Sequence, residues 1–315
     1  MNKKWMIILS SIALLFIVII VGATFYFYGV AIARADKGFL DDNPDLKVDP
    51  ALQTSEQERM AWWNTQPFED WILTSGDGLK LHAYFLKSKS SSAKTVILAH
   101  GYAGKPEQMG DLAQMYSEDL GYNVLIPDAR GHGKSEGNYI GFGWPERKDY
   151  VQWIHQVLTT LGNEQQIVLH GVSMGGATVM MTSGEDLPSN VKAIVEDCGY
   201  TSAEDELKYQ LKRMYHLPTF PLVQTTSLMT QIRAGYSFAE ASALEQVKKS
   251  KTPMLFIHGD ADLFVPSEMV YELYKIGPEP KKLYIAKGAG HGLARKVDPT
   301  AYDAEVTNFI AHYVK

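Results

Sequence analysis

The hydrophobic pattern at the start of the chain predicts a membrane anchor. Positions 5–33 contain no Asp, Glu, Lys, Arg or His, and the most apolar part is IILSSIALLFIVIIVGATFYFY at 7–28. A helix of about 20 apolar residues crosses a bilayer core. Lys3 and Lys4 precede the run, which favours a cytoplasmic N-terminus. We therefore predict an anchor over residues 1–35, with the rest of the chain outside the cytoplasmic membrane.

A cleaved signal peptide is the alternative interpretation of the same segment. The two lysines would be its positive region, and Ala33-Arg34-Ala35 resembles an A-x-A cleavage site. A secretory apolar region has about 7–15 residues, however, and this one is longer. We favour an uncleaved single-pass anchor in the cell membrane, with secretion after cleavage as the alternative.

The next stretch, residues 36–61, is polar with scattered Asp and Pro. This composition predicts a linker with a short helix near 55–62, because Ser55 is followed three residues later by Glu58. A single domain is expected over residues 62–315.

Within this domain, short apolar runs alternate with stretches of helical pattern. Two runs flank Gly76-Asp77-Gly78 and predict an antiparallel hairpin. Six further runs follow at 95–100, 123–128, 166–171, 191–197, 253–259 and 281–287. Apolar strands separated by helices are typical of a mainly parallel sheet covered on both faces. The pattern thus predicts an α/β domain with about eight strands, and a helical insertion at about 199–251 that caps a site at the carboxyl end of the sheet.

Composition narrows the possible partners. The chain has 315 residues and a net charge of −6, so its bulk charge predicts no nucleic-acid partner. Cys198 is the single cysteine, which excludes an internal disulfide and a Cys-rich metal cage. We expect neither a metal nor an organic cofactor.

The sharpest chemical motif is Gly171-Val172-Ser173-Met174-Gly175-Gly176, between a predicted strand and a predicted helix. A tight strand–turn–helix junction lifts the serine hydroxyl clear of the sheet, as in a nucleophile elbow. A serine needs a base, and the base needs a carboxylate to orient it. His291 is the expected base because it lies in the Gly-rich loop KGAGHG after a predicted strand.

The carboxylate is expected between Ser173 and His291, at the end of a strand. HGDADLFVP at 258–266 offers Asp260 and Asp262, and we favour Asp262, with Asp260 shaping the turn. An oxyanion hole needs two N–H donors. The expected donors are the backbone amides of Met174, which follows the serine, and Tyr102, in the loop HGYAG.

Five motifs in this order carry a resemblance to a known family: HGYAG, DARGHGKSEG, GVSMGG, HGDADLFVP and GAGH. Together they resemble the α/β-hydrolase superfamily, in particular its bacterial serine esterases, thioesterases and S33/S9-like aminopeptidases. The resemblance covers about 68–315 and implies the α/β-hydrolase fold and a Ser173–Asp262–His291 triad. It says little about the substrate, because this scaffold carries many activities.

The expected activity is hydrolysis of a carboxylic ester, either a small molecule or lipid-like. Aminopeptidase-like or thioesterase activity on the same triad is the alternative. Glu204, Asp205 and Glu206 in the insertion could bind a substrate amine, but basic residues lie beside them. Acyl transfer to another acceptor and a non-catalytic, membrane-tethered binding module also remain open.

Overall fold

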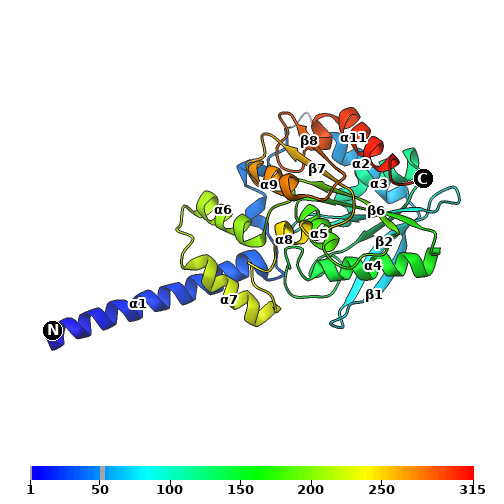
Figure 1. Ribbon diagram of the computed structural model, residues 1–315. Coiled ribbons are helices and arrows are strands. Elements are labelled where there is room, and N and C mark those ends of the chain that lie inside the picture. Colours follow the sequence, from blue (N-terminus) through cyan, green and yellow to red (C-terminus); the bar gives the residue numbers. More distant parts are fainter. Residues whose placement is uncertain (1, 50–53) are drawn as a thin grey trace.

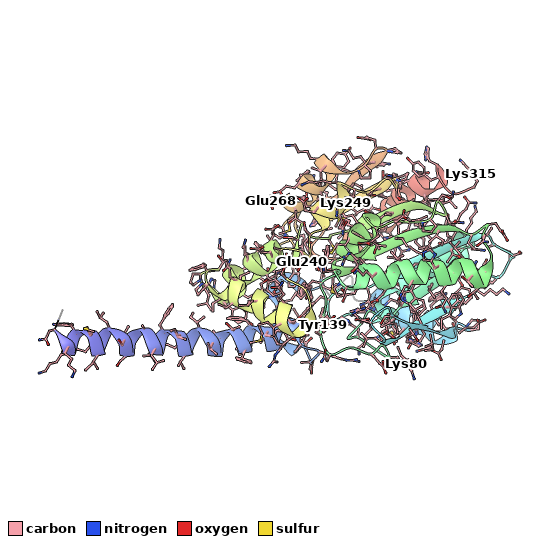
Figure 2. All side chains as sticks on the ribbon, turned by 60° about the horizontal axis from the view of Figure 1, so that its bottom comes forward. Lys80, Tyr139, Glu240, Lys249, Glu268 and Lys315 are labelled. Carbon is pink, nitrogen blue, oxygen red and sulfur yellow. The ribbon has the colours of Figure 1, made fainter. Side chains whose placement is uncertain are left out.

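The computed structural model describes residues 2–49 and 54–315. Its first helix, α1 (Lys3–Phe27), projects from an otherwise compact body, and the N-terminus lies far from it (Figure 1). By length and composition, the segment Lys3–Ile32 could cross a membrane. Side chains point outward all along its free part (Figure 2).

The body is built on one eight-stranded sheet with the order β1-β2-β4-β3-β5-β6-β7-β8. β1 pairs antiparallel with β2, which confirms the predicted hairpin, and β2 pairs antiparallel with β4. All other neighbours are parallel. The strands are β1 (Glu69–Thr74), β2 (Lys80–Leu86), β3 (Lys94–Ala99), β4 (Asn123–Pro127), β5 (Gln166–Val172), β6 (Val191–Asp197), β7 (Met254–Gly259) and β8 (Lys281–Ala286).

Helices cover both faces of this sheet, because its central strands are apolar on both sides. On β3, Ile97 belongs to a core shared with Trp153 of α4, whereas the adjacent Val96 belongs to a core shared with Phe309 of α11. The helices of the body are α2 (Thr54–Thr65), α3 (Gly110–Gln114), α4 (Glu146–Leu161), α5 (Met174–Ser183), α8 (Ala243–Val247), α9 (Glu268–Ile276), α10 (Ala294–Val297) and α11 (Pro299–Ala311).

The predicted insertion contains two helices that stand away from the sheet, α6 (Ala203–Tyr215) and α7 (Leu222–Ala234), which we call the cap (Figure 1). α7 packs along the end of α1. The hydroxyls of Thr24 and Thr225 join the two helices at 2.7 Å.

The segment that follows α1 is part of the body. A short π-helical turn, Tyr28–Ile32, carries two side chains that are 8% and 0% exposed, those of Tyr28 and Ile32. Arg34 donates hydrogen bonds to the carbonyls of Gly133 and Ser135, at 2.8 Å each. The boundary expected at residue 35 stays a prediction, but residues on the anchor side of it lie in the core.

The expected linker contacts the cap. Gly38–Leu40 and Pro44–Leu46 form single 3-10 turns, and the carboxylate of Asp45 pairs with Arg213 of the cap. The predicted helix near 55–62 is α2; residues 50–53 of the linker lie outside the described residues.

Candidate active site

Ser173 lies in a strained turn between β5 and α5. Its φ of 60° and ψ of −121° are unusual for a residue other than glycine. The strand and the helix approach so closely that the two flanking glycines leave no room for a side chain. A Cβ on Gly171 would lie 2.1 Å from the carbonyl oxygen of Gly175, and one on Gly175 would lie 1.9 Å from that of Ala99. This is the local geometry that the Gly-x-Ser-x-Gly pattern predicts.

The structure brings the other two predicted side chains to Ser173. His291, in the loop after β8, has its Nε2 2.7 Å from Ser173 Oγ. Its Nδ1 lies 2.8 Å from Oδ2 of Asp262, in the turn after β7. The three residues therefore form one hydrogen-bonded chain. They meet because β5, β7 and β8 are parallel, so their carboxyl ends share one edge of the sheet.

Asp262 is held as a carboxylate by its surroundings. Burial would raise its pKa, but the charge on His291 and hydrogen bonds from His258 and His291 hold the pKa well below its usual range. Its Oδ1 accepts hydrogen bonds from the amides of Phe264 and Val265, both at 2.9 Å. These two bonds fix the carboxylate plane so that Oδ2 faces His291.

His258 was not predicted as a site residue, yet it lies directly behind the carboxylate. Its Nε2 is 3.3 Å from Asp262 Oδ2 and 3.0 Å from the carbonyl oxygen of Val265, and the side chain is fully buried. The sequence signal was present, since His258 opens the motif that contains Asp262, but a histidine inside an apolar strand is typical of a core residue.

The other acid of this motif, Asp260, joins two loops. Asp260 Oδ1 accepts a hydrogen bond from the amide of Gly288 at 2.5 Å, which ties the turn after β7 to the loop that carries His291.

The loop predicted to complete an oxyanion hole lies beside the serine. A Cβ on Gly101 would be 3.4 Å from that of Ser173, so the loop passes next to the serine just before Tyr102. Met174 begins α5, and the first amides of a helix have no acceptor within it. The oxyanion role of the Tyr102 and Met174 amides stays a prediction. The Tyr102 hydroxyl donates to the carbonyl of Ala31 at 2.8 Å, so this loop also holds the end of the anchor.

An apolar pocket starts at Ser173 and runs between the body, the cap and the end of α1. Phe142, Phe238 and Phe264 supply aromatic walls. Its N-terminal wall was not predicted and includes Phe27, Val30, Ala31, Phe39 and Leu40. These positions belong to the apolar run and to the expected linker, where composition alone predicts no contact with a substrate.

One acidic group interrupts this apolar lining. Glu206 of α6 is 4% exposed and lines the pocket. Its Oε1 accepts a hydrogen bond from Gln210 at 2.8 Å, whereas Oε2 has no hydrogen-bond partner among the described residues. Burial raises the pKa of Glu206 to about 8. Its two acidic neighbours are engaged elsewhere: Glu204 pairs with Lys208, and the Asp205 carboxylate accepts a hydrogen bond from the hydroxyl of Ser202, the N-cap of α6.

Two triad residues, together with Cys198, form the group of side chains that most resembles a metal site in the described part of the chain. The ligand atoms of Cys198, Asp262 and His291 lie within 4.8 Å of one another, the one such grouping found in the described part of the chain. Burial raises the pKa of the Cys198 thiol well above its usual value, which disfavours the thiolate that a metal requires. His291 and Asp262 are already hydrogen-bonded to each other, so we propose no metal here.

Comparison with known proteins agrees with this architecture. Residues 94–221 match the family model of the alpha/beta hydrolase fold. YqkD of Bacillus subtilis is 29% identical over 240 residues, which cover 76% of this chain and 78% of that protein. The lysophosphatidylserine lipase ABHD12 of Danio rerio is 26% identical over 239 residues, 74% of this chain and 59% of that one.

Among solved structures, the Pyrococcus furiosus esterase Pf2001 superposes with a TM-score of 0.65 and 24% identity, over 80% of this chain and 93% of the esterase. At this identity the likeness speaks for the fold alone. The ordered motifs, the sheet topology and these matches together lead to one conclusion: the chain has the α/β-hydrolase fold, and the matches support a place in the α/β-hydrolase superfamily.

Proposed function

We propose that this protein is a serine hydrolase that cleaves a carboxylic ester through an acyl-enzyme. The observation that carries the proposal is the continuous hydrogen-bonded chain from Ser173 Oγ through His291 to Asp262, at the end of an apolar pocket. A serine alone is a weak nucleophile, and this arrangement supplies the base and the group that orients it.

The first half of the reaction follows from these contacts. Ser173 Oγ attacks the ester carbonyl carbon while His291 Nε2 takes the hydroxyl proton. The amides of Tyr102 and Met174 stabilise the resulting oxyanion. As the tetrahedral intermediate collapses, the bond from the carbonyl carbon to the leaving oxygen breaks, and His291 gives that oxygen its proton. The alcohol leaves and the acyl group stays on Ser173.

Water completes the cycle by the same route. It attacks the acyl carbon and gives a proton to His291, and the acid leaves as Ser173 recovers its proton. Throughout, the Asp262 carboxylate accepts the hydrogen bond from Nδ1 of His291 and stabilises the imidazolium that forms. Its pKa, held below the usual range, keeps it ionised at neutral pH.

The test is covalent labelling combined with turnover. The full chain in detergent is treated with a fluorophosphonate, the adduct is located by peptide mass, and p-nitrophenyl esters from C2 to C16 are assayed. We expect an adduct on Ser173, and loss of both adduct and turnover in Ser173→Ala. Ser90→Ala, an exposed loop serine, is the matched control and should keep both. A folded protein with neither adduct nor turnover would instead favour a tethered binding module.

Glu206 supports a second candidate, hydrolysis of a substrate that carries a free amine. A buried carboxyl in an apolar pocket becomes ionised when a cation enters beside it, which would select aminoacyl amides or esters. The comparison is between aminoacyl p-nitroanilides and the simple esters, in wild type and Glu206→Gln. If anilide turnover is high and only that turnover falls in the variant, the peptidase-like activity is the better description.

A further inference from the structure

The cap carries a group of exposed apolar side chains, which we call the cap patch. Leu217 is 38% exposed, Phe220 74%, Leu228 57% and Ile232 74%. The first two lie in the connection between α6 and α7. The other two lie four residues apart on α7 and so share one face of the helix. The surfaces of soluble proteins rarely expose several large apolar side chains close together unless a binding partner or a membrane covers them.

The helix that carries two residues of the cap patch, α7, packs beside the anchor. α7 runs along the C-terminal part of α1 in both views (Figures 1 and 2). Thr24 bonds to Thr225, and the rings of Phe27 and Tyr215 meet edge to face at 5.1 Å. The contact extends back along α1, because the half-buried Ile20 also packs against the core. At 1.5 Å per residue, Ile20 lies about 10 Å along the helix axis from Phe27.

The length of α1 sets the depth of this contact relative to a bilayer. A hydrocarbon core of about 30 Å takes about 20 helical residues. Counted from Trp5, just after Lys3 and Lys4, such a span ends near Thr24, and aromatic residues follow it, as is common at the headgroup level. Because Ile20 packs against the core and Thr24 bonds to Thr225 of α7, the cap reaches the boundary between acyl chains and headgroups.

The charge of α7 suits that position. Its sequence, LVQTTSLMTQIRA, contains no acidic residue, and its one charged side chain is Arg233. The guanidinium of Arg233 lies over the ring of Phe25, 5.3 Å from the ring centre, at the headgroup end of α1. An arginine at this level can bind lipid phosphate while its stem stays among apolar groups.

We propose that the cap docks on the bilayer through the cap patch, so that the apolar pocket opens to membrane lipid and receives a lipid acyl chain from it. The pocket supports this, since one wall is Phe27, Val30 and Ala31 of the anchor and another is Met214 and Tyr215 of the cap. A chain that leaves the bilayer between α1 and the cap thus finds apolar surface up to Ser173. This inference rests on the proposed function, for which it names a membrane lipid ester as the substrate class.

The first experiment measures docking without any turnover. The full chain carrying Leu228→Cys is labelled with bimane and placed in phosphatidylcholine–phosphatidylglycerol vesicles that contain lipids brominated on the acyl chain. The native Cys198 is 1% exposed and should not react. We expect at least twofold quenching at position 228. Ile72→Cys is the matched control, because Ile72 is 57% exposed on β1, across the body from the cap (Figure 1). Equal quenching at both positions, or none at 228, overturns the proposal.

The second experiment separates lipid access from chemistry. Leu228→Glu combined with Ile232→Glu places two charges on the cap patch without touching the pocket lining. Turnover of an ester embedded in vesicles should fall at least tenfold, while kcat/KM for soluble p-nitrophenyl butyrate stays within twofold. Ile72→Glu should change neither. Loss of both activities, or of neither, contradicts docking. If Ser173→Ala still cleaved the soluble ester, the proposed function would fail, and the quenching result would still decide docking.

Discussion

Replacing Glu206 by glutamine should stabilise the protein increasingly as the pH rises. Burial raises the pKa of this carboxyl from 4.5 to about 8, so between these values the folded protein holds a proton that the unfolded chain releases. The unfolded state then binds fewer protons, and the free energy of unfolding of the wild type falls as pH increases. The glutamine has no proton to lose, while its amide oxygen can still accept the hydrogen bond from Gln210.

The size of the effect follows from the separation of the two pKa values. A difference of about 3.5 units corresponds to roughly 5 kcal/mol when fully developed. Most of it falls between pH 5 and pH 8, where the gap in unfolding free energy between variant and wild type should widen by about 4 kcal/mol. Any cost of burying the amide adds a constant and does not change this slope. Other buried acids, such as Glu196, cancel in the comparison of the two proteins.

The assay is urea unfolding of the detergent-solubilised full chain, followed by tryptophan fluorescence at pH 5, 6, 7 and 8. Glu204→Gln, on the same helix, is the control for removing a carboxylate. Parallel curves for wild type and Glu206→Gln would refute the reasoning. They would mean that the Glu206 carboxylate is charged in the folded protein, and that the pocket holds water or a cation beside it.

Three other substitutions test the site and the core. Asp262→Asn should lower kcat for p-nitrophenyl acetate by about 10³–10⁴-fold, because a carboxylate no longer orients His291. Asp260→Asn is the control, and circular dichroism verifies folding. A loss below tenfold would contradict the role of Asp262. Ile32→Ala removes a fully buried side chain and should lower the free energy of unfolding by about 2–4 kcal/mol, measured by urea unfolding. Ile12 on α1 is 59% exposed, so Ile12→Ala should not change it. Gly175→Ala puts a methyl 1.9 Å from the carbonyl oxygen of Ala99 and should prevent folding, while Gly22→Ala meets nothing within 4 Å; the yield of folded, detergent-solubilised protein distinguishes them.

Much of the fold could be predicted because parallel strands have a distinctive sequence pattern. Buried on both faces, they appear as short continuous apolar runs, and the six runs predicted after the hairpin correspond to β3 to β8. The antiparallel pair β1 and β2 was predicted from the turn between its two runs. The proximity of Ser173, Asp262 and His291 followed from the same fact. Each comes just after a strand, and the ends of parallel strands lie at one edge of the sheet.

The N-terminal wall of the pocket could not be predicted in this way. Phe27, Val30 and Ala31 continue an apolar run that suits lipid, and burial in lipid and burial in protein select the same side chains. Hydropathy therefore marks these positions as buried without saying in which medium. The same limit applies to the acids at 204–206. Which of the three faces the pocket depends on how α6 is rotated against its neighbours, and only the packed structure shows that it is Glu206.

The junction at Ile32 and Arg34 has a kinetic consequence. Ile32 is fully buried and Arg34 bonds to the carbonyls of Gly133 and Ser135, so the anchor enters the body without a free tether. With α1 in a bilayer, the hydrolase domain is held at the membrane surface, whereas a domain on a flexible linker would move through the surrounding solution. It then meets lipid substrates by diffusion within the plane of the membrane. The rate of turnover of a lipid ester should therefore follow the mole fraction of that ester in the membrane. Diluting that substrate with inert lipid should slow turnover even when its total amount is unchanged.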